Sequence, residues 1–308
     1  MGRYVVRRLL QVIPVFLGTT FLIYTLVWVM PGNPLLTLGG NRALPDSVLA
    51  ELRDRYNLGD PLLVQYGKYL WGLLHGDFGS SFTGREVAEI MANRWPVTVK
   101  LAATAWVFEM VFGLALGILA ALKRGKFADT AVLAGTTLII AVPVFVLGYS
   151  AQLLFGVELG WLPISGTASG WPAAYLLPGM VLGAISLAYV ARLTRTSLVE
   201  NLRADYVRTA VAKGLSRRRV IGKHALRNSL IPVITYLGVD IGSLMGGAIV
   251  VEGVFNLPGI GQLVFKSVKL QEGAVVVGVV TVLVLIYVFA NLLVDLLYGV
   301  LDPRIRYD

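Results

Sequence analysis

Only a few side chains in this sequence are placed where they could do chemistry. Glu109, in WVFEMVFG, and Asp240, in YLGVDIGSL, each lie in the middle of a long apolar stretch. A charge at the centre of a membrane helix costs about 2.5–3.5 kcal/mol, so such acids face the interior of a helix bundle, a partner or water. We expect one or both to line a path for a polar solute. The alternative is that each is a protonated or hydrogen-bonded structural acid between two helices.

Other residue sets that support catalysis or cofactor binding are missing from the sequence. There is no cysteine, and the two histidines, His75 and His224, are far apart, which excludes a disulfide framework and argues against a histidine metal site. There is no G-x-x-x-x-G-K-[ST] loop for ATP, and no Ser/His/Asp set. We therefore predict no catalytic residue, cofactor or metal in this chain.

One strongly basic segment, DYVRTAVAKGLSRRRVIGKHALRN at 205–228, lies between two apolar stretches. Asp205 can cap a helix that runs through YVRTAVAK, and Gly214 offers the left-handed conformation that ends such a helix. Ser216 can cap a second helix that leads towards Pro232. The segment thus predicts a short helix, a tight turn and a longer basic helix.

The short helix carries residues suited to a groove on another protein. Small Thr209 and Ala210 lie among Tyr206, Arg208 and Lys213. The SRRR cluster that follows is less specific, because anionic lipid headgroups attract such residues by about 1 kcal/mol each. The residues alone leave a docking element and a headgroup anchor both open. Nucleic acid is not an expected partner, because no aromatic stacking platform accompanies the arginines.

The composition indicates that membrane helices position these residues. Of the 308 residues, 56% are hydrophobic and 15% are charged, and the mean hydropathy is +0.73, whereas soluble proteins are nearer a quarter charged. The first apolar stretch is too long for a signal peptide, and no small-residue cleavage site follows it. A membrane helix needs about 20 apolar residues, and six stretches approach or exceed this length: 9–30, 97–122, 130–155, 176–191, 229–252 and 274–298. The predicted fold class is all-α, with six transmembrane helices.

Lys and Arg near the ends of these spans predict the orientation, because short cytoplasmic loops are enriched in them. If the N-terminus is cytoplasmic, the inner segments hold 18 of the 27 basic residues, ten of them between Arg192 and Arg227. Six of the eight on the outer side lie in one long loop, to which the rule does not apply. Both termini and the basic segment are therefore expected in the cytoplasm.

The long outer loop, 31–95, shows helical spacing in PDSVLAELRDRY, with Asp46 or Ser47 as a possible N-cap, and in LLVQYGKYLWGLL. A small helical cap on the outer face and a plain ordered connector are both compatible with it.

Small residues gather in GLALG (113–117) and GSLMGG (242–247), and each stretch contains a Gly-x-x-x-Gly spacing that predicts close helix packing. We further hypothesise that the fifth span and the NLPGIG loop after it form part of an outer gate. The residues assigned to this gate are Gly246, Asn256, Pro258 and Gly259.

Along its whole length, the chain resembles one family. DYVRTAVAKGLSRRRVIGKHALRNSLIPVI is similar to the permease signature of bacterial ABC importers, in particular the dipeptide, oligopeptide and nickel permeases. The resemblance extends to PGNP (31–34), LRDRYNLGDPLLVQY (52–66), GDFGSS (76–81), RWPVTVKL (94–101), VEGVFNLPGIG (251–261) and DPRIRY (302–307).

This resemblance implies the type I ABC importer architecture in the plasma or inner membrane, with a coupling helix that sits in a cleft of an ATPase subunit. The implied coupling residues are Asp205, Tyr206, Arg208, Thr209, Ala210, Lys213 and Gly214. The implied partners are a second homologous permease, two ATP-binding subunits that hold ATP and Mg, an extracytoplasmic substrate-binding protein, and membrane lipid. The implied activity is the import of short peptides, whose amino group Glu109 or Asp240 would meet. Nickel, glutathione or another small solute is the alternative cargo.

The sequence departs from the family pattern at two places. Arg208, Thr209 and Ala210 stand where the general signature has Glu-Ala-Ala, and PGDP reads PGNP here, with Asn33. The contacts of those two family acids are therefore not carried over. The predicted division is an N-terminal helix at 1–30, an outer loop region at 31–95, a permease core at 96–302 with a coupling loop at 192–228, and a tail at 303–308.

Two other classes of function compete with an importer. A proton-coupled secondary transporter could use Glu109 and Asp240 without an ATPase, but no inverted repeat is found in the sequence. In a membrane scaffold or lipid-binding protein, the basic segment would act only through its charge.

Overall fold

The computed structural model describes residues 2–29, 47, 50 and 59–301, and long helices dominate it. Five of its helices are long and apolar enough to cross a membrane, and a bent pair adds a sixth span if it is counted as one. In chain order the helical elements are α1 (Gly2–Val29), α4 (Leu62–Leu74), α5 (Val87–Leu122), α6 (Phe127–Ala141), α7 (Val144–Ala151), η1 (Gln152–Glu158), α8 (Ala173–Asn201), α9 (Asp205–Ala212), α10 (Arg217–Arg219), η2 (Val220–Ala225), α11 (Leu226–Val254), α12 (Ile260–Lys269) and α13 (Gly273–Leu301).

The third span differs from the prediction of one helix over 130–155. α6 ends at Ala141 and α7 begins at Val144, and the two halves of the span meet at 107°. Pro143 has no N–H to donate and disfavours the helical conformation at Val142, which is extended with φ −95° and ψ 129°. The span predicted at 130–155 is therefore present as a bent pair of helices and not as one continuous helix.

α5 and α8 form the centre of the bundle, where glycines let the two backbones approach. A Cβ atom at Gly117 would lie 2.6 Å from the carbonyl oxygen of Ala191, and one at Gly183 would lie 2.7 Å from that of Ala105. The close packing predicted for 113–117 is confirmed. In 242–247 a Cβ atom at Gly242 would lie 3.3 Å from the ring of Tyr287 in α13, while Gly246 has open space around it.

α8 is longer than the predicted 176–191 and continues to Asn201 because polar side chains in its second half find partners. Arg195 donates from Nε to Oδ1 of Asp129 at 2.5 Å, and its second nitrogen lies 2.7 Å from Oδ2. Asp129 is buried at the start of α6. This bidentate ion pair, which was not predicted from the sequence, fixes α6 against α8.

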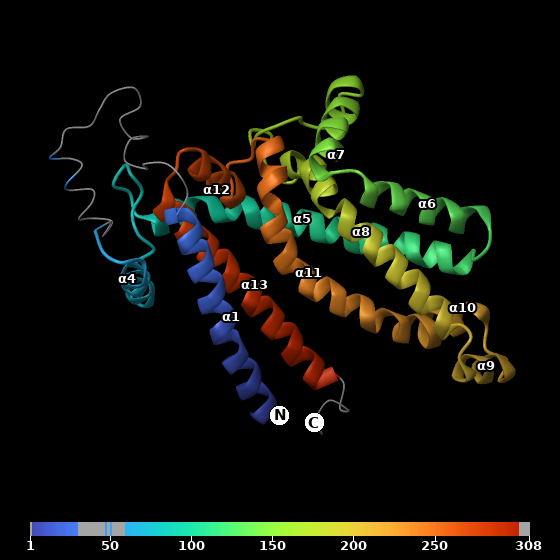
Figure 1. Ribbon diagram of the computed structural model, residues 1–308. Helices are drawn as coiled ribbons and strands as arrows, with labels where there is room; N and C mark the ends of the chain where they lie inside the picture. Colours follow the sequence, from blue (N-terminus) through green and yellow to red (C-terminus); the bar gives the residue numbers. More distant parts are fainter. Residues whose placement is uncertain (1, 30–46, 48–49, 51–58, 302–308) are drawn as a thin grey trace.

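Figure 1 shows how the elements are distributed between the two ends of the bundle. α1 and α13 run side by side in opposite directions. The start of α1 and the end of α13 lie at the bottom of the view, the α5–α6 turn at its right and α9 at its lower right, whereas α4 and α12 lie at the left and upper left and α7 lies at the top. The described parts of the segments predicted to be cytoplasmic therefore share one end of the bundle.

The outer loop contributes α4, whose bounds coincide with the predicted LLVQYGKYLWGLL. Tyr66 donates to the carbonyl of Leu17 in α1 at 2.9 Å, and Tyr69 donates to Thr281 in α13 at 2.7 Å. Burial raises the pKa of Tyr69 to about 12, so this hydroxyl keeps its proton and remains a donor. The predicted helix in PDSVLAELRDRY lies almost wholly outside the described residues, as does the tail at 303–308.

Candidate functional site

α9 joins α8 to the helical segment that begins at Arg217. Gly214 ends it with φ +74°, as predicted. The N-cap position belongs to Ala204, so the prediction that Asp205 caps the helix was one residue off; Asp205 is the first helical residue, where a negative charge still favours the helix N-terminus. Ser216 stands at the predicted N-cap of the next helix, although its side chain makes no capping hydrogen bond.

The two faces of α9 have different surroundings. Val207 and Ala210 are only 4% and 5% exposed, and they pack into a cluster with residues of α5, α8 and η2. Ala210 was predicted to contact a partner, but it packs against other helices of its own chain. We call Val207 and Ala210, the two buried residues of α9, its seat. The exposed predicted residues are Asp205, Tyr206, Arg208, Thr209, Lys213 and Gly214.

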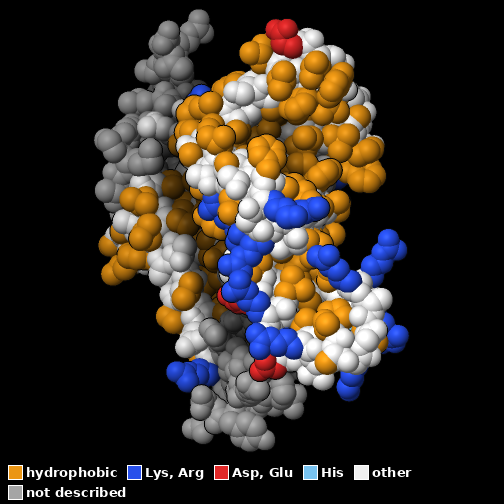
Figure 2. Space-filling view, turned by 90° about the vertical axis from the view of Figure 1, so that its right-hand side faces the viewer, with side chains coloured by type: hydrophobic (Ala, Val, Ile, Leu, Met, Phe, Trp, Pro, Cys, Tyr) orange, Lys and Arg blue, Asp and Glu red, His pale blue; other side chains and the backbone are white. Residues whose placement is uncertain are grey.

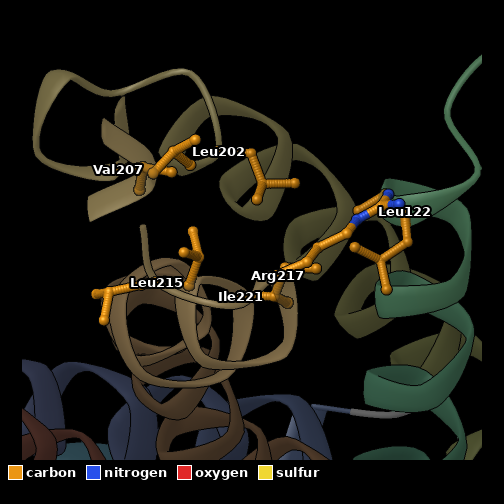
Figure 3. Close-up of a pocket in the computed structure, with 9 residues that line it drawn as sticks. Leu122, Leu202, Val207, Leu215, Arg217 and Ile221 are labelled. Atoms are coloured by element: carbon orange, nitrogen blue, oxygen red, sulfur yellow. The ribbon is translucent and has the colours of Figure 1, made fainter. Parts of the chain in front are cut away.

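Below α9 the packing leaves a cavity of about 440 Å³. Figure 3 shows Val207 and Leu202 on one side of it and Leu215 and Ile221 on the other, while Arg217 extends towards Leu122. Apolar side chains form nearly all of its described lining, and Arg217 is the one charged residue in that lining. α9 is therefore fastened to the bundle mainly through Val207 and Ala210.

The surface around α9 is strongly basic. Figure 2 shows Lys and Arg side chains gathered over the lower part of this face, with a mostly apolar surface above them. This distribution fits a membrane protein whose basic end meets anionic headgroups and an aqueous compartment. The exposed basic residues here are Lys123, Arg124, Lys126, Arg203, Arg208, Lys213, Arg217, Arg218, Arg219, Lys223 and Arg227.

The structure brings Glu109 of α5 and Asp240 of α11 to the same place. Each acid interacts with the other, and Ser186 of α8 and Tyr236 of α11 complete the group. Glu109 is 0% exposed and Asp240 is 6% exposed. Both carboxyl oxygens of Glu109, and one of Asp240, have no hydrogen-bond partner of normal geometry among the described residues. Two neighbouring carboxyl groups with free oxygens can hold a proton or a cationic group between them.

Three of the four predicted gate residues lie in the turn between α11 and α12. Asn256 is exposed, has φ +49°, and accepts a hydrogen bond from the Gln262 side chain at 2.8 Å. Pro258 is half-buried and Gly259 is buried. Gly246, the fourth, lies earlier on α11 and faces open space.

Two residues that were not selected from the sequence hold this turn in place. Glu252 and Thr98 are both 0% exposed, and the Thr98 hydroxyl donates to Glu252 Oε1 at 2.6 Å. An acid inside the apolar run IVVEGVF was the available signal for Glu252. For Thr98 there was no such signal, because buried threonines are common in helices.

Comparison with known proteins finds, along the whole chain, the family that the sequence motifs resemble. Residues 113–307 match the family described as binding-protein-dependent transport system inner membrane component, and residues 1–102 match the N-terminal part of such membrane components. The dipeptide transport system permease protein DppB of Alkalihalophilus pseudofirmus is 38% identical over 336 residues, covering all of both chains. The glutathione transport system permease protein GsiC of Salmonella typhimurium is 41% identical over 308 residues, again covering all of both.

The fold is similar to that of a solved ABC importer. A structure of inward-facing conformations of the MetNI methionine ABC transporter aligns with a TM-score of 0.57 and 18% identity, covering 69% of this chain and 96% of that one. At this level of identity the likeness concerns the type I importer fold alone. From the family match, the full-length relatives and the apolar helices together, the chain belongs to the inner membrane permease subunits of binding-protein-dependent ABC importers and is a multi-pass inner membrane protein.

Proposed function

We propose that this chain imports short peptides as one permease subunit of an ATP-driven transporter. The observation that carries the proposal is its end-to-end similarity to permeases named for dipeptide and glutathione transport. Glutathione is itself a peptide, so a peptide-sized cargo accounts for both names. Nickel or another small solute is the second candidate, because cargo choice in such systems also depends on the binding protein.

The proposed assembly contains a second homologous permease, two ATP-binding subunits and an extracytoplasmic substrate-binding protein. ATP and Mg bind in the ATP-binding subunits, where hydrolysis takes place. α9 is the proposed contact with one of them, through its exposed face of Tyr206, Thr209 and Lys213. Because Val207 and Ala210 seat α9 on α8 and η2, a push on α9 is transmitted to the helices that cross the membrane.

The proposed role of the Glu109–Asp240 pair is to meet the amino group of a peptide in the translocation path. The free oxygens of the pair support this role, because an ammonium group would satisfy them. The competing role is structural, with a proton shared between the two acids, and the full burial of Glu109 supports that alternative.

The coupling proposal is tested by Thr209→Trp, because Thr209 is exposed on α9 and a bulky side chain there does not disturb the seat. We expect the purified complex to lose its ATP-binding subunits and its peptide uptake. Thr130→Trp is the matched control, an exposed threonine on α6, and it should leave both unchanged. Retention of the ATP-binding subunits with normal uptake in the Thr209 variant would exclude α9 as the coupling helix.

A proton-coupled transporter remains the alternative from another class. Uptake into proteoliposomes with ATP inside and no proton gradient separates the two mechanisms. Uptake that needs the gradient and not ATP would overturn the importer proposal.

A further inference from the structure

Two sequence motifs, one of which contains three of the residues assigned to the outer gate, meet at the outer end of the bundle. RWPVTVKL lies on α5 and VEGVFNLPGIG joins α11 to α12. Thr98 of the first motif donates to Glu252 of the second at 2.6 Å, and the N–H of Ile260 donates to Thr98 Oγ1 at 2.8 Å. The N–H of Gln262 donates to the second carboxyl oxygen of Glu252 at 3.0 Å. One buried network therefore joins α5, α11 and α12.

This network caps α12 from outside the helix. The first N–H groups of a helix have no partner within it, and a side chain at the N-cap position usually accepts from them. Here the N-cap residue is Gly259, which has no side chain. Thr98 and Glu252 accept from Ile260 and Gln262 instead, and the carboxylate also lies at the positive end of the helix dipole.

Two glycines at the start of α12 allow its backbone to pack closely on Glu252 and on α11. A Cβ atom at Gly259 would lie 2.2 Å from Glu252 Oε1, and a Cβ atom at Gly261 would lie 2.4 Å from the Cα atom of Ile249. The backbone at the start of α12 thus packs directly on the carboxyl group of Glu252, at Gly259, and on α11, at Gly261. Release of α12 would take the N–H of Gln262 away from the carboxyl group of Glu252 and the N–H of Ile260 away from Thr98, which is unfavourable for groups that are fully buried.

We infer that Glu252 is a positioning residue that fastens α12 and the 256–259 turn to α5 and α11, so that these elements move as one body during transport. The fastening itself stands on the hydrogen bonds and the packing, and only its consequence for transport rests on the proposed function. Glu252 does not contact the cargo in this role. It transmits the movement of α5 and α11 to the outer surface.

The first test measures whether α12 moves relative to α5. The chain has no cysteine, so Ala92→Cys on α5 and Lys266→Cys on α12, both exposed, give two spin labels with no background from this subunit. Distances are measured in the complete complex, with cysteines of the other subunits replaced, without nucleotide and trapped with ATP. We expect the same single narrow distribution in both states. A distance that shifts between the two states would overturn the inference.

The second test removes the network in the same labelled complex. Thr98→Val keeps the shape of the side chain but removes the hydroxyl, and we expect at least about a tenfold rise in the undocked fraction of α12, seen as a broader distribution. Thr98→Ser restores the hydroxyl and should restore the narrow distribution. Thr104→Val is the matched control, because the one hydrogen bond of the Thr104 hydroxyl among the described residues goes to the backbone of its own helix, at Lys100. An equally narrow distribution in Thr98→Val would refute the fastening.

Uptake is measured in the same variants to test the consequence for transport. We expect Thr98→Val to import less substrate per ATP hydrolysed, with ATP hydrolysis itself retained and the loss reversed in Thr98→Ser. If the parent complex imports no peptide, the proposed function fails while the distance measurements still decide the fastening. Unchanged uptake per ATP in a variant with a broadened distribution would contradict the transmission of movement by Glu252.

Discussion

At the scale of single residues, three buried acids in apolar helices have different surroundings. Glu252 has both carboxyl oxygens bonded, to Thr98 and to the N–H of Gln262. Glu109 lies against Asp240 and Ser186, but neither of its oxygens has a hydrogen-bond partner of normal geometry among the described residues, and one oxygen of Asp240 has none either. A carboxyl group that is fully bonded stabilises one arrangement, whereas a pair with free oxygens is available for a proton or a cation.

Isosteric amides at the two glutamates should therefore have opposite effects. Glu109→Gln removes one acid from an adjoining pair, so we expect an unchanged or higher apparent Tm of the purified complex and at least about a tenfold loss of peptide uptake. Glu252→Gln brings an NH₂ group against groups that donate, so we expect a lower apparent Tm. Thermal unfolding in detergent and uptake into proteoliposomes measure both effects. Normal uptake by Glu109→Gln would assign the acid pair a structural role.

At the scale of helices, the α5–α8 pair depends on backbone contact. Gly113 and Gly117 of α5 face Val190, Ala191 and Thr194 of α8, and Gly179 and Gly183 of α8 face Thr104 and Ala105 of α5. Helices in a membrane associate mainly through such close packing, because lipid is as apolar as a leucine side chain. The helices α6, α9 and α11 pack against this α5–α8 pair.

Gly183→Val should separate this pair, because the new Cβ would lie 2.7 Å from a backbone oxygen that cannot rotate away. We expect the variant to lose most of its accumulation in the membrane. Gly135→Val on α6, where a Cβ meets nothing within 4 Å, is the matched control and should accumulate like the parent. Quantitative immunoblotting of membrane fractions measures this. Equal amounts of the two variants would contradict the importance of close α5–α8 contact.

The apolar spans and the short helix α9 could be predicted from the sequence because length and local turn chemistry determine them. The bend at Pro143 could have been anticipated, since proline breaks the helical ladder, but its angle depends on packing. The inward position of Ala210 could have been predicted as well, because Val207, Ala210 and Val211 follow the i, i+3, i+4 spacing of a buried helix face. The meeting of Glu109 with Asp240, and of Thr98 with Glu252, depends on which spans become neighbours, and the span pattern leaves that open.

At the scale of the whole molecule, the basic segments lie at one end of the bundle and α4, α7 and α12 at the other (Figure 1). The positive-inside rule then places the α5–α6 turn and α9 in the cytoplasm and the residues after η1 outside. This orientation is a prediction that the absence of cysteine makes simple to test.

Single cysteines at two exposed positions should report the orientation. Trp161, after η1, and Lys126, in the α5–α6 turn, are both exposed. In cells whose outer membrane has been made permeable, a membrane-impermeant maleimide should label Trp161→Cys and not Lys126→Cys. In inverted membrane vesicles the pattern should reverse. The opposite pattern in both preparations would invert the predicted topology.

The cap that α12 receives from α5 has a consequence for biosynthesis. Thr98 and Ile260 are 162 residues apart in the chain, so α5 leaves the ribosome long before its partner exists. Glu252 enters the membrane ten residues ahead of Gln262, and until the chain reaches that point its carboxyl group has no donor from α12. The outer end of the bundle can therefore be completed only in the last stage of synthesis. A chain truncated before residue 260 would hold most of its spans and still lack the network that joins α12 to α5 and α11.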